Sequence, residues 1–114
     1  MEHLLCCLSD ALGVELNVDE SALQVDDELI VHFEESERGL EMICPLGELP
    51  TDTARLQRVL KMNYVGPLVL AADADGVALL ALVRMPDGSS GDELVAALEG
   101  LIQTARGIKE ELYF

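Results

Sequence analysis

The spacing of hydrophobic residues predicts that the chain begins with a helix. Leu5, Leu8 and Leu12 recur at helical intervals, and Gly13 follows them as a typical stop signal. Residues 1–13 are therefore predicted to form an amphipathic helix that buries one face.

After this helix the pattern changes to an alternation of apolar and polar residues, which is typical of half-buried strands. Acidic turns divide the alternating region into three strands, near residues 22–26, 28–34 and 39–46. The outward face of these strands is mostly polar, with Ile30 and Ile43 as apolar exceptions. The predicted core face consists of Leu23, Val25, Leu29, Val31, Phe33, Leu40, Met42 and Cys44.

A second helix is predicted after Pro50, where Thr51 or Asp52 can cap the exposed backbone amides. Gly66 and Pro67 are expected to end it, because neither residue favours a helix interior. Its apolar surface is expected to come from Leu56, Val59, Leu60 and Met62.

A long final helix is predicted from a capping box, in which Ser90 and Glu93 each bond the other's backbone amide. The residues that follow place apolar side chains at helical intervals along one continuous stripe. This stripe comprises Leu94, Leu98, Leu101, Ala105, Ile108 and Leu112.

The run Val77–Val83, "VALLALV", has no polar face, and Ala and Leu alone would permit a helix. Its short length, a similar run just before it and the intervening Asp75-Gly76 favour a β-hairpin with a two-residue type I′ turn. That turn pairs Ala74 with Val77, Ala72 with Leu79, Leu70 with Ala81 and Leu68 with Val83 on the core face.

The reverse face of this hairpin is also apolar, since it carries Val69, Ala71, Leu80 and Leu82. Exposed patches of this kind usually mark an interface. A helix of the same chain could cross the face, or a second copy of the chain could cover it. We favour the second copy, because twofold homodimers are the commonest oligomers.

The 114-residue chain is strongly acidic, with a formal net charge of −15, and eleven carboxylates precede its first basic residue, Arg38. Such a surface repels phosphate backbones and anionic lipids, so we expect no nucleic-acid or membrane-surface binding. It favours a basic or amphipathic partner. Arg55, Arg58 and Lys61 form a basic stripe on the second helix, which either solubilises the chain or meets carboxylates across an interface.

No constellation typical of an enzyme or a metal site is recognisable. Three cysteines and two separate histidines provide neither a disulfide framework nor zinc spacing. Strand parity points Cys44 to the core and His32 outward, which argues against a catalytic pair. The segment from Asp73 does not fit a calcium loop, whose sixth and twelfth positions are Gly and Glu. We expect no catalytic residues, no metal and no cofactor.

The first residues of the chain include an acidic side chain and lack the basic region of a signal peptide. No apolar run approaches the roughly 20 residues that a membrane-spanning helix needs. The sequence therefore predicts neither a signal peptide nor a membrane-spanning helix.

Several segments together resemble the class I type III secretion chaperones of the Tir-chaperone (CesT-like) family. They are "CPLGELP", "LQRVLKMN", the hairpin "LVLAADADGVALLALVRMP" and the amphipathic last helix, in the order α-β-β-β-α-β-β-α. The resemblance extends from Leu4 to about Leu112. It implies one domain over residues 1–114 with an α+β fold, in which helices pack mainly on one face of a twisted antiparallel sheet.

The resemblance also implies a cytoplasmic bacterial homodimer without catalytic activity. Such a dimer binds the N-terminal region of a secreted effector in extended form and keeps it soluble and secretion-competent. The family's dimer contact maps here to Leu56, Leu60, Val69, Ala71, Leu80 and Leu82. Our candidates for effector contact are Ile30, His32 and Ile43, with Leu5 and Leu8 of the first helix.

A different class of function remains an alternative. The same pattern would suit a secretion-linked regulator or scaffold that sequesters a partner, or a roadblock-like small α/β dimer. An enzyme or small-ligand domain would need an enclosed pocket with convergent polar groups.

Overall fold

The computed structural model describes residues 3–13, 22–25, 29–65 and 68–113. Within these ranges the chain forms three helices and one antiparallel sheet with the strand order β1-β2-β3-β5-β4. The elements are α1 (His3–Leu12), β1 (Ala22–Gln24), β2 (Ile30–Ser36), β3 (Gly39–Glu48), α2 (Thr53–Val65), β4 (Val69–Ala72), β5 (Ala78–Pro86) and α3 (Gly91–Tyr113). The predicted element order and α+β class are confirmed.

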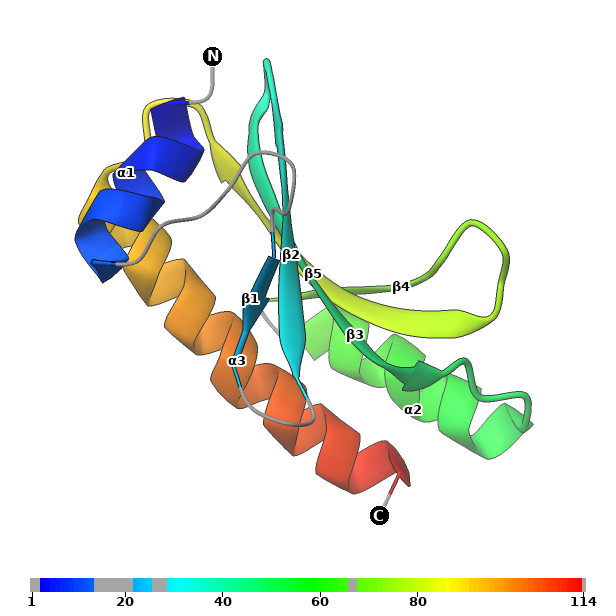
Figure 1. Ribbon diagram of the computed structural model, residues 1–114. Helices are drawn as coiled ribbons and strands as arrows, with labels where there is room; N and C mark the ends of the chain where they lie inside the picture. The colour runs from blue at the N-terminus through cyan, green and yellow to red at the C-terminus, as the bar shows by residue number, and fades with distance from the viewer. Residues whose placement is uncertain (1–2, 14–21, 26–28, 66–67, 114) are drawn as a thin grey trace.

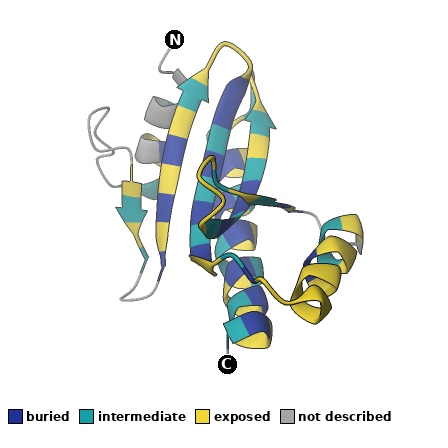
Figure 2. Ribbon diagram, turned by 90° about the vertical axis from the view of Figure 1, so that its right-hand side faces the viewer, coloured by how far each residue is buried: buried dark blue, intermediate teal, exposed yellow. Residues whose placement is uncertain are grey.

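Helices α1 and α3 pack side by side on one face of the sheet, and α2 lies separately beside β4 (Figure 1). The predicted stripe of α3 faces the sheet, and all six of its residues are buried. On β2 and β3 the alternation is also as predicted, because Val31, Phe33, Leu40, Met42 and Cys44 are buried (Figure 2). One hydrophobic core therefore fills the space between the sheet and helices α1 and α3, and Val59 of α2 also belongs to it.

Local capping bonds fix the helix starts that the sequence predicts. The Glu93 amide donates to Ser90 Oγ (3.1 Å), and the Ser90 amide donates to the Glu93 carboxylate (2.9 Å). Hydrogen bonding of the Glu93 carboxylate to the Ser90 amide and to the Ser90 side chain lowers the pKa of Glu93, because the charged carboxylate is the better acceptor. Asp52, rather than Thr51, caps α2 by accepting the Arg55 amide at 3.0 Å.

The β4–β5 hairpin has the predicted register, with Val69 opposite Leu82 and Ala72 opposite Leu79. Its turn is not the predicted type I′ turn, which would need positive φ at Asp75; only Gly76 has positive φ in this loop. The Asp73 amide instead bonds the Ala78 carbonyl (3.0 Å), which leaves a four-residue loop and no Ala74–Val77 pair.

The Asp73 carboxylate explains this longer loop. Its Oδ1 accepts the backbone amides of Val77 (2.7 Å) and Ala78 (3.1 Å), and the Asp73 carbonyl accepts the Gly76 amide (3.0 Å). Hydrogen bonds from Ala78 and Val77 hold the pKa of Asp73 below its ordinary value. The side chain thus satisfies amides that a tight turn would have had to pair through the backbone.

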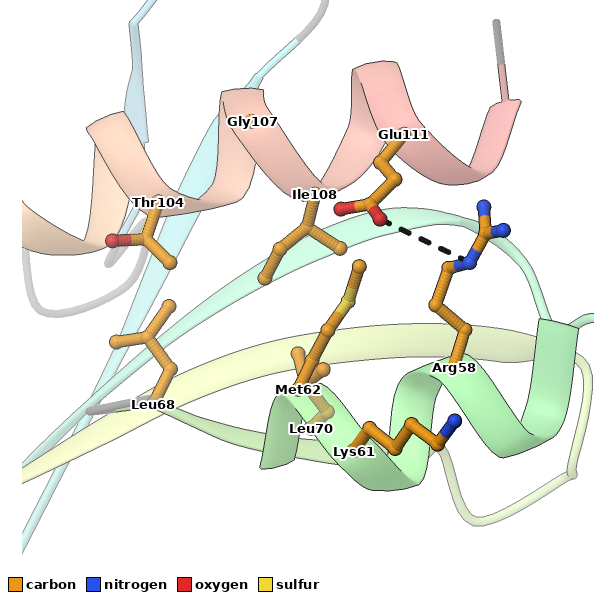
Figure 3. A pocket seen from close by; sticks show the side chains of 9 residues that line it. All are labelled: Arg58, Lys61, Met62, Leu68, Leu70, Thr104, Gly107, Ile108 and Glu111. Carbon is orange, nitrogen blue, oxygen red and sulfur yellow. Dashed lines mark ion pairs between the residues drawn. The ribbon is translucent and has the colours of Figure 1, made fainter. Parts of the chain in front are cut away.

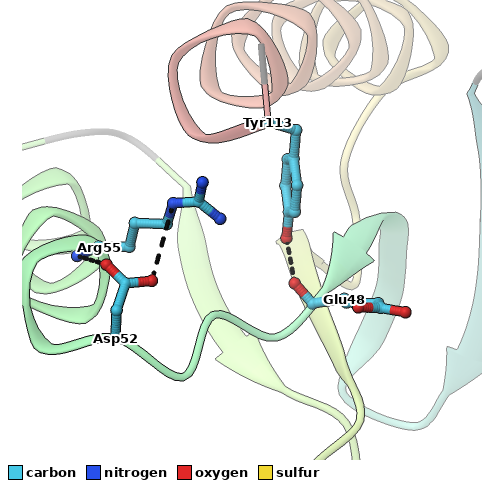
Figure 4. Close-up of polar contacts among 4 residues, drawn as sticks. All are labelled: Glu48, Asp52, Arg55 and Tyr113. Carbon is cyan, nitrogen blue, oxygen red and sulfur yellow. Dashed lines mark hydrogen bonds and ion pairs between the residues drawn. The ribbon is translucent and has the colours of Figure 1, made fainter.

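Two side chains attach the outlying elements to the sheet. The Leu4 amide at the start of α1 donates to Glu35 of β2 at 2.6 Å. At the other end of the chain, the Tyr113 hydroxyl donates to the Glu48 carbonyl, while its ring lies against Gly47 (Figure 4). Burial raises the pKa of the Tyr113 hydroxyl. These contacts hold both terminal helices in place on the sheet.

Candidate protein-binding surfaces

One row of side chains crosses four strands on the sheet face opposite α1 and α3. The register places His32 beside Ile43, Ile43 beside Leu82, and Leu82 beside Val69. Side chains that are directly opposite on neighbouring strands lie about 5 Å apart and contact one another. His32 and Ile43 of the predicted effector set and Leu82 and Val69 of the predicted dimer set therefore form one continuous surface, which we call the outer row.

The flanks of the outer row differ in polarity. On one side Pro45, Leu80 and Ala71 are register neighbours, which widens the apolar surface. On the other side Glu34, Glu41 and Arg84 are neighbours, and Arg84 Nε lies 2.6 Å from the Glu41 carboxylate. The ion pair offsets the repulsion between the two glutamates and sets a polar border to the apolar surface.

Exposure along this face differs in part from the sequence-based expectation. Val69 is 42% exposed, and Ala71 and Leu80 are half-buried, as expected of an unfilled apolar face. Leu82, which we expected to be exposed in the single chain and covered by a second copy, is already only 6% exposed in the single chain. Its central position between Ile43 and Val69 explains this, because both neighbours cover it.

Helix α2 adds a second exposed apolar surface. Leu56 and Leu60 are 36% and 67% exposed, and Tyr64 is 91% exposed. At 3.6 residues per turn these three side chains follow one face of the helix, which we call the α2 stripe. Tyr64 is not among the interface residues predicted from the sequence, although its spacing of four residues from Leu60 places it on the same face of the helix.

The predicted effector-contact residues separate into two groups. Ile30 is 42% exposed, His32 is exposed and Ile43 is half-buried, so all three are accessible on the outer sheet face. Leu8 is 0% exposed and belongs to the core, so its proposed partner contact is wrong for the single chain. Leu5 belongs to α1, but its side chain lies outside the described residues.

A groove of about 720 Å³ separates α2 from the C-terminal half of α3 (Figure 3). Leu68 and Leu70, at the β4 end of the hairpin, line it together with residues of both helices. The α2 residues are Arg58, Lys61 and Met62, and the α3 residues are Thr104, Gly107, Ile108 and Glu111. Arg58 Nε lies 3.9 Å from the Glu111 carboxylate, so a weak, half-exposed ion pair joins the two helices at the edge of the groove.

The surface features of the described residues are apolar patches and single ion pairs, which suit contact with another polypeptide. Among these residues, no group of three or more His, Cys, Asp or Glu side chains is placed to hold a metal ion. Cys44 is buried and Cys7 half-buried, and neither forms a disulfide bond. No helix in these ranges has the length and apolarity needed to cross a membrane.

A small α+β domain that presents apolar surfaces on a sheet and a helix is typical of proteins that bind other polypeptides. Comparison with known sequences narrows this class. Residues 3–113 match the type III secretion chaperone domain, and the chain therefore belongs to that family. The family is one of chaperones rather than enzymes, in agreement with the sequence-based expectation; the Tir-chaperone subfamily stays a prediction.

Individual relatives cover nearly the whole chain. The chaperone protein SigE of Salmonella typhi is 44% identical over 110 residues, which are 96% of this chain and 97% of SigE. The chaperone protein IpgE of Shigella sonnei is 28% identical, covering 97% of this chain and 93% of IpgE. In the solved HopA1-SchA chaperone–effector complex, one chain superposes with a TM-score of 0.75 at 19% identity, covering 96% of this chain and 92% of that chain.

Proposed function

We propose that this protein is a homodimeric bacterial chaperone that binds the N-terminal region of a type III secretion effector in extended form. In this role it keeps the effector soluble and competent for secretion in the cytoplasm. The observation that carries the proposal is the outer row, an apolar surface that crosses four strands of the sheet and ends at a polar border.

The division of the outer face supports two partners. Val69, Ala71 and Leu80 lie at the β4 end of the sheet, where α2 adds its exposed stripe, and we assign this end to the second copy. Ile30, His32 and Ile43 lie on β2 and β3, and we assign them to the effector. Ile43 and Leu82 are register neighbours, so the effector surface borders the dimer surface directly.

The sheet edges support binding of an extended chain. Strand addition supplies affinity through main-chain hydrogen bonds and needs little sequence specificity. The β4 edge is occupied at Leu70, where Asn63 bonds both the backbone amide and the carbonyl. We therefore assign strand addition to the other edge strand, β1.

Co-expression tests this function. The N-terminal fragment of a secreted protein encoded beside this gene is expected to become soluble and to co-purify with the wild-type chain. Ile30→Asp should reduce the amount recovered, because a charge in the apolar contact must be desolvated. Val77→Asp is the matched control, since Val77 is 63% exposed in the β4–β5 loop and away from the outer row.

Two results would contradict the proposal. One is that no such fragment co-purifies or gains solubility; the other is that Ile30→Asp and Val77→Asp retain it equally. Capture of a transcription factor in place of a secreted protein would favour the regulatory alternative.

A further inference from the structure

The groove between α2 and α3 has an apolar floor and, at Gly107, a gap in its α3 wall. Met62, Leu68, Leu70 and Ile108 supply the apolar atoms. On α3, Gly107 faces the groove, and a Cβ added there would meet no atom within 4 Å. The missing side chain leaves room beside the floor for a partner's apolar residue.

The α2 rim of the groove is basic in a chain whose net charge is −15. Arg58 pairs with Glu111 of the α3 rim: Arg58 Nε lies 3.9 Å from the Glu111 carboxylate, and both side chains are about half exposed. Lys61 is exposed and makes no ion pair with any residue that the structure describes. Lys61 therefore presents an uncompensated positive charge beside an apolar cavity.

The groove and the α2 stripe occupy opposite sides of one helix. Leu60 projects from the stripe, whereas Arg58 and Met62 lie two residues before and after it, about 160–200° away around the helix. A second copy that covers the α2 stripe and the outer sheet face would leave the groove open. The groove is thus available to a different occupant.

From these observations we infer that the α2–α3 groove binds an apolar segment of the secreted partner that carries an acidic side chain, whose carboxylate pairs with Lys61. This inference rests on the proposed chaperone function and adds a recognition element to it. Acidic residues outnumber basic ones 22 to 7 in the chain, so most of its surface repels a carboxylate and the basic α2 rim is a favourable position for one. Repulsion of the acidic side chain at other surface positions determines where along the chaperone a bound segment lies. It has less effect on how tightly the segment binds.

Synthetic peptides test the inference without the natural partner. The probe is a short fluorescent peptide of Leu and Ser with a single central Glu, and the matched peptides carry Gln or Lys at that position. In fluorescence anisotropy the Glu peptide should bind at least about fivefold more tightly than the Gln peptide, the gain expected of one partly desolvated ion pair. The preference should weaken as salt is added, because salt screens the Lys61 charge.

Two pairs of variants locate the site. Gly107→Leu fills the groove and should weaken binding at least about tenfold, as expected when a central contact is lost. Gly100→Leu is its control, because Gly100 is also exposed on α3 with open space at its Cβ but does not line the groove. Both substitutions favour the helical state, so the fold should persist.

The second pair tests the charge. Lys61→Glu should reverse the preference from the Glu peptide to the Lys peptide. Arg38→Glu makes the same charge change at an exposed position away from the groove and should leave the preference unchanged.

The inference is overturned if the Glu peptide shows no saturable binding, if Gly107→Leu and Gly100→Leu bind it equally, or if Lys61→Glu keeps the wild-type preference. It is also overturned if Gly107→Leu alone converts a dimer to a monomer, since the groove would then hold the second copy. Failure of the chaperone function has a different signature: no effector fragment co-purifies with the wild-type chain, whatever the peptides do.

Discussion

Asn63 of α2 and Leu70 of β4 form two hydrogen bonds that close one edge of the sheet. The Asn63 amide nitrogen donates to the Leu70 carbonyl at 3.2 Å, and the Leu70 amide donates to the Asn63 oxygen at 3.1 Å. A side-chain amide thus occupies the position that a sixth strand would take. An unpaired edge is a template for aggregation, which this pair prevents at Leu70.

Asn63→Ala is expected to lower the free energy of unfolding by about 1–3 kcal/mol, because two bonds at a half-buried position are lost together. The unpaired edge should also promote concentration-dependent association. Urea denaturation and light scattering measure the two effects. Gln57→Ala, at an exposed position of the same helix, is the control, and equal stability of the two variants would contradict the assignment.

Leu60→Asp is expected to convert the proposed dimer to a monomer, because the charge lies within the α2 stripe while the fold of the single chain is unaffected. The side chain is 67% exposed, so its removal costs the isolated chain little. Light scattering at micromolar concentration measures the mass. Ala96→Asp, exposed on α3, should leave the mass unchanged; a monomeric wild type, or a dimeric Leu60→Asp, would contradict the interface.

Asp73→Asn is expected to reduce stability in a pH-dependent way. The folded state lowers the pKa of Asp73, so the charged carboxylate stabilises the fold above its unfolded pKa, and this contribution is lost as the pH falls through the folded value. The wild type should therefore be the more stable protein at pH 7. The difference should shrink as the pH is lowered from the ordinary value of 3.8.

Denaturation of both proteins across this pH range measures the difference. Asp75→Asn, in the same loop, is the control and should follow the wild type throughout. A stability difference between Asp73→Asn and wild type that stays constant with pH would contradict the role of the charge.

Gly47→Ala is expected to destabilise the protein by about 1–3 kcal/mol, through overpacking against Tyr113 and through backbone strain, because residues with a Cβ rarely adopt the φ of +157° found at Gly47. An added Cβ would lie 2.9 Å from the ring carbon Cζ, and the hydroxyl bond to Glu48 keeps the ring from moving away. In a double-mutant cycle, Tyr113→Ala should remove the overpacking part of the cost and leave the backbone strain, because only the overpacking depends on the contact with the ring. Additive effects of the two substitutions would rule out this contact as the cause.

The β4–β5 hairpin shows what the sequence could and could not predict. The apolar run and the Asp-Gly pair were sufficient for the register, since a two-residue and a four-residue loop pair the same residues beyond Asp73. The turn type depended on the Asp73 carboxylate, whose bonds to Val77 and Ala78 form only in three dimensions. Local pattern therefore predicted the pairing and missed the means by which the loop is closed.

The candidate surfaces show the same limit. Parity correctly assigned Ile30 and Ile43 to the outer face, because side chains alternate along a strand. The shielding of Leu82 depends on β3 being the neighbour of β5, a long-range pairing that no local pattern encodes. The α2–α3 groove could not be predicted either, because it depends on how two helices that are distant in sequence pack in three dimensions.

The placement of β5 between β3 and β4 has a consequence for folding during synthesis. Strands β3 and β5 form the central strand pair of the sheet, in which Gly39 lies opposite Pro86. Strand β3 therefore has no partner on that side until β5 has left the ribosome. Until then the β2–β3 hairpin presents both Ile43 and the core-facing Met42 to other chains. Pairings between segments that are distant in sequence form slowly, and the intermediates that precede them are prone to aggregate. A member of a chaperone family therefore passes through a stage in which its own nascent sheet is open to contact with other chains.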